Sequence, residues 1–600
     1  MLIYTIFINL TPPKPKKMLK KLILIGLPVI VIGAGVYAYV FLLKKSQEHF
    51  KLIPSDSFGV MTIDLKSIAE KGNYKAWGDL FVTKKLNESA KPEGENGRFM
   101  KELISNPLSM GIDPVSDLYL FFQYSGNSQP SFGIAFAVRN ETDLENVLMK
   151  IPEKDLSVDK KEVQNKEGYK LFHFSKGAAL AWKKGAGLFA TGLTDADLDT
   201  YVDKIMKQEK SASLADRKDF LEFTQKKQDI GIYINYAGIF NSSIGSMATL
   251  TLQSNQYIAA FKTASVTMSI LFEKDKIAIR SFYQNSNPDA FDKYSFIGSS
   301  ALTEGILKSL TPKPPLAFWG FTMDMKKLLA LLISDIATMQ SISGAVKDLG
   351  VTPVELGNLL GGELAATLND FKMSAVEKKH YGWDPATNEP TESMVTDTTL
   401  LPEFSLTLSI NDKAVLQKLL DHFKLPKDEA GYYKMAIGSD YYLAEDKAGI
   451  TLTNSGEIAT ELNSKKEFPS IIGGKAGEIA KSAPTAFYID LTLNDYPEAV
   501  RTYLNKMMKE ENYKLFNDFM NMFICIDGKG TSKEGEMNIR MSGSDENSLW
   551  RIIKQSDNIG QQIDLQKKKK EKEEAEQEQK HAMDQATAVA DSLAASAGSR

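Results

Sequence analysis

Phe132-Gly-Ile-Ala-Phe-Ala-Val-Arg139 and Phe404-Ser-Leu-Thr-Leu-Ser-Ile-Asn411 are the two stretches of sequence that decide the fold. In both, every second residue is large and apolar, and the residues between are small or polar. Successive side chains of a strand point to opposite faces, so this alternation is typical of a half-buried antiparallel strand. The sequence therefore predicts one such strand at each place.

The residues that follow each stretch change to a helical spacing. Apolar residues recur at i, i+3, i+4 and i+7, which puts them on one stripe of a helix. Thr142, with Glu145 three residues later, has the spacing of a capping box. We therefore predict an α+β fold in which an antiparallel sheet has helices packed on one face. The stripe residues are Leu144, Val147, Leu148 and Ile151 in the first helix, and Leu416, Leu419, Leu420 and Phe423 in the second.

The strand–helix pair is one of several landmarks that occur twice in the same order. Asp64 and Asp324, for example, end two similar Pro-led strands and lie 260 positions apart (324 minus 64). That offset is too long for a solenoid, whose repeats are about 20–50 residues. We therefore expect two tandem related modules of antiparallel sheet with packed helices, at residues 52–300 and 311–553. Further matched landmarks are Gly111-Ile-Asp-Pro114 with Gly350-Val-Thr-Pro353, and Ile277-Ala-Ile-Arg280 with Met537-Asn-Ile-Arg540.

The opening of the first module resembles a known family. Ile53-Pro54, the run Ile63-Asp-Leu-Lys-Ser-Ile68 and Gly111-Ile-Asp-Pro114 look like a Bacteroidota family of long envelope proteins classed as a domain of unknown function. The resemblance covers most of residues 50–550, and its motifs are structural. It implies an envelope location and no known reaction. Members are commonly lipoproteins, whereas the only cysteine of this chain, Cys525, is far from its N-terminus.

Residues 22–43 form an uncharged apolar run bracketed by lysines. At ~1.5 Å per residue, such a helix is long enough to cross a ~30 Å hydrocarbon core. More lysines precede the run than follow it, so the positive-inside rule puts residues 1–21 in the cytoplasm. A cleaved signal peptide is the main alternative, but its apolar region is normally only ~7–15 residues long. We expect a single-pass protein of a bacterial inner membrane with its body in the periplasm.

Composition limits the chemistry of the body. The net charge of −4 shows no basic domain for nucleic acid, and one cysteine permits no disulfide within the chain. The five histidines include no pair at i, i+4, so no zinc motif is present. Asp64, Asp324 and Asp490 each end a strand before a helix, where an acid caps the helix. The sequence predicts no catalytic, cofactor-binding or metal-binding residue.

Two segments lie outside the repeated pattern. Residues 371–402 are a long polar insertion, which is either functional or disordered. Residues 556–600 are a charged tail, either a weak partner-docking helix or an unstructured end. The residues we predict for partner binding are His380, Tyr381 and Trp383 in the insertion, and Met583 and Leu593 in the tail.

These observations favour a non-enzymatic binding or scaffold component of the cell envelope. Its expected partners are the membrane, through residues 22–43, and another envelope protein. One alternative is an envelope hydrolase whose site assembles only in three dimensions from acids such as Asp64 and Asp324. Another is a lipid or hydrophobic-ligand binding protein, which requires an apolar cavity between sheet and helices.

Overall fold

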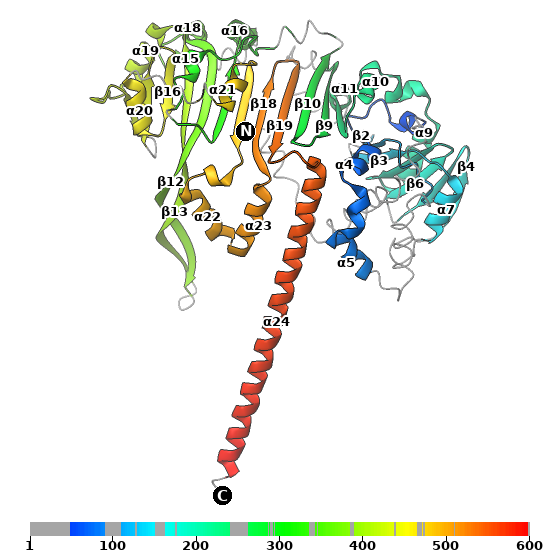
Figure 1. Ribbon diagram of the computed structural model, residues 1–600. Helices are drawn as coiled ribbons and strands as arrows, with labels where there is room; N and C mark the ends of the chain where they lie inside the picture. Colours follow the sequence, from blue (N-terminus) through cyan, green and yellow to red (C-terminus); the bar gives the residue numbers. More distant parts are fainter. Residues whose placement is uncertain are drawn as a thin grey trace.

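A computed structural model gives the fold of most of the chain (Figure 1). The predicted cytoplasmic segment 1–21 and the apolar run 22–43 lie outside the residues that it describes. Within the described residues, no helix combines the length and apolarity needed to cross a membrane. The described ranges are 48–89, 110–125, 129–150, 162–174, 177–240, 262–285, 295–311, 313–334, 349–384, 389–436, 440–464, 474–508 and 510–597, with a few isolated positions between them.

The strands form one sheet of nineteen strands, and every pairing within the described residues is antiparallel. In spatial order, the first half contains β4 (Val163–Lys166), β5 (Tyr169–His173), β6 (Ala178–Lys183), β7 (Ala186–Thr191), β3 (Gln129–Phe136), β2 (Leu118–Ser125), β1 (Gly59–Ile63), β8 (Ile230–Asn235), β9 (Ala264–Phe272) and β10 (Lys276–Asn285). The second half, from its own outer end inward, contains β14 (Tyr433–Ala436), β15 (Asp440–Glu445), β16 (Gly449–Thr453), β13 (Glu389–Ile410), β12 (Leu360–Asp384), β11 (Ala317–Thr322), β17 (Thr485–Asp490), β18 (Phe523–Gly530) and β19 (Glu534–Met541).

The strand order of the second half repeats that of the first from β5 to β10. The two halves meet where β10 pairs with β19, which closes the inner edge of both. Ala278 pairs with Asn538, and these two residues also correspond in the sequence repeat, being 260 positions apart (538 minus 278). The halves are therefore joined through equivalent residues, as across a local two-fold axis.

Helices cover both faces of the sheet, not one as the sequence predicted. We call face A the side that carries Val60, Tyr233 and Phe318, and face B the opposite side. On face A, the core contains residues of η1 (His49–Leu52), α9 (Asp195–Lys207) and α10 (Lys218–Gln225) in the first half, and α15 (Glu304–Leu307) and α21 (Lys475–Ala480) in the second. On face B, α7 (Glu141–Lys150) packs on the outer strands of the first half, and α18 (Pro353–Leu359) and α19 (Lys413–Phe423) on those of the second.

Equivalent side chains cap α7 and α19, the helices whose apolar stripes the sequence predicted. The Asn140 Oδ1 accepts hydrogen bonds from the backbone N–H groups of Thr142 and Asp143, at 3.0 and 3.2 Å. Asp412 does the same for the N–H groups of Ala414 and Val415. The cap of α7 is therefore Asn140, two residues before the Thr142 that the sequence predicted.

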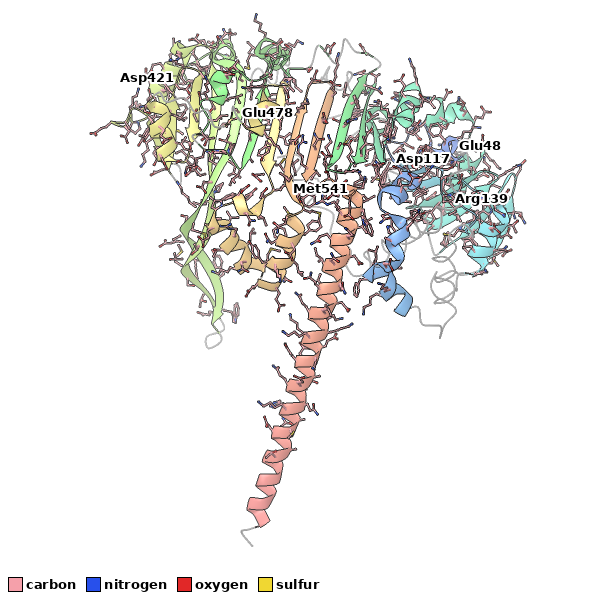
Figure 2. The ribbon with its side chains drawn as sticks, viewed as in Figure 1. Glu48, Asp117, Arg139, Asp421, Glu478 and Met541 are labelled. Atoms are coloured by element: carbon pink, nitrogen blue, oxygen red, sulfur yellow. The ribbon has the colours of Figure 1, made fainter. Side chains whose placement is uncertain are left out.

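Helix α24 (Ser548–Ala597) ties the two halves together and then projects from the body (Figures 1 and 2). Phe81 and Val82 are the first residues of α5 (Phe81–Ser89), in the first half. The Asp557 carboxylate accepts hydrogen bonds from their backbone N–H groups, at 2.7 and 2.9 Å. The Gln555 side chain donates to the Asp518 carbonyl in the second half at 3.2 Å. At ~1.5 Å per residue, its 50 residues make a helix of about 75 Å.

The other helices are short connections between strands. They are α4 (Leu65–Lys71), η2 (Tyr74–Asp79), η4 (Lys210–Ala212), η5 (Leu214–Asp216), α11 (Tyr236–Phe240), α16 (Met325–Ser334), α20 (Gly456–Asn463), η6 (Leu493–Asp495), α22 (Glu498–Met508) and α23 (Glu510–Met520).

Gly111 and Gly350, which match in the sequence repeat, allow a test of how closely Gly111 packs against the start of α7. Gly111 and Gly350 both have a left-handed backbone, with φ of 72° and 69°. A Cβ at Gly111 would lie 2.3 Å from the Asn140 carbonyl oxygen and 2.4 Å from the Leu144 nitrogen, whereas a Cβ at Gly350 meets nothing within 4 Å. We expect Gly350→Ala to cost about 1 kcal/mol and Gly111→Ala about 2–4 kcal/mol, because only Gly111→Ala adds overlap to backbone strain.

Urea unfolding of the two variants measures this difference. Equal losses of stability would contradict the close contact of Gly111 with the start of α7.

Candidate functional site

The hairpin β12–β13 extends beyond the sheet (Figure 1). Strand β11 pairs with β12 only as far as Leu368, and β16 pairs with β13 only from Ser405. The remaining hairpin pairs with itself from Asp370–Glu403 out to Asp384–Glu389. The predicted polar insertion 371–402 is therefore a two-stranded arm over most of its length.

A register shift at the root of this arm decides which side chains share a face. Before the shift, Leu368 pairs with Phe404; after it, Asp370 pairs with Glu403. The extra residue in β12 forms a β-bulge. Beyond a bulge, the odd-numbered and even-numbered side chains of the bulged strand exchange faces. As a result, face B of the arm carries Lys379 and Glu392 together with six apolar residues, whereas the exposed Leu401 lies on the opposite face. The six apolar residues are Phe371, Met373, Tyr381 and Trp383 of β12, and Met394 and Leu400 of β13.

These six residues, which we call the hairpin surface, become more exposed toward the tip. The exposed fractions are 45% for Met373, 58% for Met394, 61% for Trp383 and 69% for Tyr381. At the root, the rings of Phe371 and Tyr496 stack with their centroids 6.4 Å apart. An ion pair between Lys379 and Glu392, at 2.5 Å, joins the two strands of the arm.

The structure places the predicted partner-binding residues in two separate regions. Tyr381 and Trp383 lie on the hairpin surface. His380 directly precedes Tyr381 in β12 and pairs with Ser393, and its side chain is outside the described part of the structure. Met583 is 72% exposed on the projecting part of α24. Leu593 belongs to the far end of the same helix, which lies well away from the arm in Figure 1.

Sequence reasoning missed Met373, Met394 and Trp319, each at least 45% exposed. The sequence analysis predicts a polar insertion at residues 371–402, and this prediction omits the two methionines, although apolar residues recur at even intervals within the insertion. Trp319 lies in β11, and its 46% exposed side chain is on the face opposite the buried Phe318. The available signal in all three cases was the period-two alternation of the strands.

The three strand-ending acids cap local structure and do not converge. The Asp64 carboxylate accepts the Ser67 N–H at 2.9 Å and caps α4. The Asp324 carboxylate accepts the Lys327 N–H at 3.1 Å at the start of α16, and the Asp490 carboxylate accepts the Thr492 N–H at 2.8 Å. Strands β11 and β17 are antiparallel neighbours. Asp324 and Asp490, which stand at the C-terminal ends of these strands, therefore lie at opposite ends of the strand pair.

His49 is a buried titratable group. It is 1% exposed, and its Nε2–H donates to the Asp117 carbonyl at 2.8 Å. Burial lowers the pKa of His49 to about 4. A neutral imidazole inside the core stabilises the fold and offers no access to a substrate. Across the described residues, no group of three or more His, Cys, Asp or Glu side chains could hold a metal ion.

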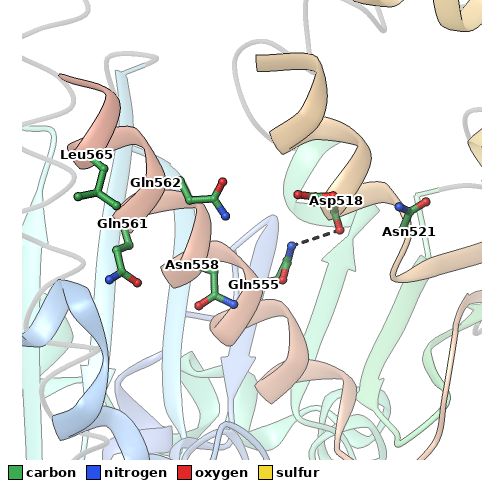
Figure 3. Close-up of a pocket in the computed structure, with 7 residues that line it drawn as sticks. All are labelled: Asp518, Asn521, Gln555, Asn558, Gln561, Gln562 and Leu565. Atoms are coloured by element: carbon green, nitrogen blue, oxygen red, sulfur yellow. Dashed lines mark hydrogen bonds between the residues drawn. The ribbon is translucent and has the colours of Figure 1, made fainter. Parts of the chain in front are cut away.

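A polar groove of about 640 Å³ lies between α23 and α24 (Figure 3). Its lining contains no cation and one carboxylate, and the hydrogen bond from Gln555 to Asp518 crosses it. Carboxamides do not titrate near neutral pH, so Asp518 is the single acid–base group among the lining residues and the others provide hydrogen bonds only. The lining residues are Asp518, Asn521, Gln555, Asn558, Gln561, Gln562 and Leu565.

These features define an α+β protein with a single large antiparallel sheet, an exposed apolar arm and no assembled catalytic centre in the described residues. The chain belongs to the family described as a domain of unknown function (DUF4836), which matches residues 50–549. No curated protein matches it.

One solved structure that the chain matches is crystal form III of TP0453. The sequences are 10% identical, and the match covers 40% of this chain and 80% of that chain with a TM-score of 0.21. A likeness this low carries no argument about fold or function.

The buried histidine predicts a pH dependence of stability. An unfolded chain protonates His49 below its usual pKa of about 6.5, whereas the folded chain keeps it neutral down to about 4. The unfolded state therefore binds more protons between these values, so this contribution is complete above pH 6.5 and is lost as the pH falls toward 4. We expect a loss of about 3 kcal/mol over that interval from His49.

Chemical unfolding of wild type and His49→Gln between pH 7 and pH 4 tests this. The variant should show the shallower decline. Parallel curves for the two proteins would show that His49 does not remain neutral in the fold.

Proposed function

We propose that the chain is a membrane-tethered envelope protein that binds a partner protein through the hairpin surface. The observation that carries the proposal is a set of large apolar side chains on one face of an arm that projects beyond the sheet. Trp, Tyr and Met are enriched at the centres of protein interfaces, where burial of large side chains supplies most of the binding energy. An exposed apolar patch of this kind marks an interaction site.

A comparison of the equivalent hairpins in the two halves supports a binding role for the arm. Its equivalent hairpin, β2–β3, has two strands of 8 residues, whereas β12 and β13 have 25 and 22. The sheet is thus built in the first half without such an arm. The extension in the second half is therefore best explained by a role outside the sheet.

The proposal includes the topology and modules expected from the sequence. Residues 22–43 anchor the chain in the inner membrane, residues 1–21 are cytoplasmic, and the body is periplasmic. Modules at 52–300 and 311–553 are supported by the repeated strand order. Glu48, where the described chain begins, lies on the first half, away from the arm and from the free end of α24 (Figure 2). This arrangement leaves the arm accessible to a partner.

A hydrolytic function lacks comparable support, because Asp64, Asp324 and Asp490 are used as caps at separate places. A hydrophobic-ligand function would require an apolar cavity between sheet and helices, whereas the groove described above, between α23 and α24, is lined mainly by polar side chains.

A photo-crosslinking amino acid placed on either face of the arm tests the partner. At Tyr381, on the hairpin surface, we expect an adduct of defined mass in cells. At Thr391, which is exposed on the opposite face of β13, we expect none. Trp383→Ala with Met394→Ala should remove the Tyr381 adduct, because both changes delete interface area.

The matched control is Thr391→Ala with Ser393→Ala, which should leave the Tyr381 adduct unchanged. Equal adducts at Tyr381 and Thr391, or no adduct at Tyr381, would exclude docking on the hairpin surface.

A reporter that is active only outside the cytoplasm, fused after residue 600, tests the topology. We expect activity, and we expect it to be lost when Val29 and Val31 are both replaced by Lys, because charges in the apolar run block membrane insertion. An inactive reporter on the unaltered chain would show that the body is cytoplasmic.

A further inference from the structure

The groove between α23 and α24 is lined mainly by carboxamide side chains (Figure 3). Four lining residues recur at intervals of three, four and three along α24, which places them on one stripe of the helix. The stripe faces α23, because the Gln555 side chain donates to the Asp518 carbonyl. Stripes that face a neighbouring helix normally carry apolar residues, whereas this one is suited to hydrogen bonding. Its residues are Gln555, Asn558, Gln562 and Leu565.

Most of the carboxamides in the groove are accessible to a ligand. Gln555 and Asp518 are half-buried where the hydrogen bond joins the two helices, and the other lining residues are exposed. A carboxamide carries two N–H donors and an acceptor oxygen, so it matches a ligand group that both donates and accepts. The exposed carboxamides are Asn521, Asn558, Gln561 and Gln562.

The charge of the groove disfavours an anion. Asp518 is the one charged residue of the lining, and it lies in the last turn of α23, where the helix dipole is negative. A phosphate or carboxylate would meet this negative charge with no cation among the lining residues to offset it. A single carboxylate also gives little charge to hold a calcium ion, whose affinity depends on the number of charged ligands.

The polarity of the groove disfavours an apolar ligand and an apolar segment of a protein. Either would cover the carboxamides without forming hydrogen bonds to them, which is unfavourable. Protein interfaces are centred on large apolar side chains, as the hairpin surface is. Leu565 is the one apolar residue of the groove lining. The groove therefore calls for a different kind of ligand from the hairpin surface.

We infer that this groove binds a neutral oligosaccharide. Each sugar hydroxyl both donates and accepts a hydrogen bond, and hydroxyls occur along the whole length of a sugar chain, as carboxamides do along the groove. The volume of about 640 Å³ falls within the range of ~300–1,000 Å³ that is usual for ligand sites. Leu565 supplies an apolar contact for the C–H groups of a sugar ring. The groove shares no residue with the hairpin surface, so this inference is independent of partner binding there.

Isothermal titration calorimetry of the full chain with maltohexaose, cellohexaose and mannohexaose tests the site. The chain is kept in a detergent without a sugar headgroup, because such a headgroup competes with the probes. We expect at least one of the three to bind, and the anionic oligosaccharide trigalacturonate not to bind. Asn558→Ala with Gln562→Ala should weaken binding at least tenfold, because it removes exposed donors and acceptors of the groove. Alanine at these exposed helix positions favours the helix, so the fold should tolerate both changes.

The matched control is Gln577→Ala with Gln579→Ala, which removes two exposed carboxamides from the same helix outside the groove. We expect this variant to bind the oligosaccharide as tightly as wild type does. No binding of any of the three neutral probes, or equal affinity for trigalacturonate, would overturn the inference. Equal affinities of wild type and the Asn558→Ala, Gln562→Ala variant would also overturn it, because the binding would then lie elsewhere.

Discussion

The pairing of β10 with β19 is the contact on which the rest of the structure depends. Each strand would otherwise be the inner edge of its own sheet, with a row of unpaired N–H and C=O groups. Pairing them satisfies both edges at once and makes one nineteen-stranded sheet from two similar halves. Because Ala278 faces its own equivalent, Asn538, the same local geometry serves both halves. Helix α24 reinforces this junction by holding α5 of the first half beside α23 of the second.

A joined sheet has properties that neither half has alone. On face B, Ile277 lies beside Ile539 and Ile279 beside Met537, so apolar side chains of the two halves adjoin only when β10 and β19 are paired. The hairpin surface lies on the same face, because the bulge between Leu368 and Asp370 keeps the alternate apolar residues of β12 on that side.

Much of the local structure could be predicted from the sequence, because it depends on neighbouring residues. The alternation at Phe132 and Phe404, the helical stripes after them and the capping roles of Asp64 and Asp324 follow from spacing alone. The junction could not be predicted, because no pattern in Ile277–Arg280 shows which strand it will pair with. The capping acid Asp557 lies in a segment that looked like a solvated tail, and its two N–H partners lie more than 470 positions away. The sequence predicts only part of the hairpin surface. It indicates Tyr381 and Trp383 as binding residues, but the bulge that places Met373 and Met394 on the same face cannot be predicted from the sequence.

Hydrogen exchange of the full chain, read by mass spectrometry over residues 276–282 and 534–540, tests the junction most directly. Paired strands in the middle of a sheet exchange slowly, whereas an edge strand leaves half of its amides open to solvent. The account predicts that both segments exchange as slowly as the inner strands β8 and β17. Rapid exchange in both, with β8 and β17 still protected, would show that the two halves are separate sheets and would contradict the account.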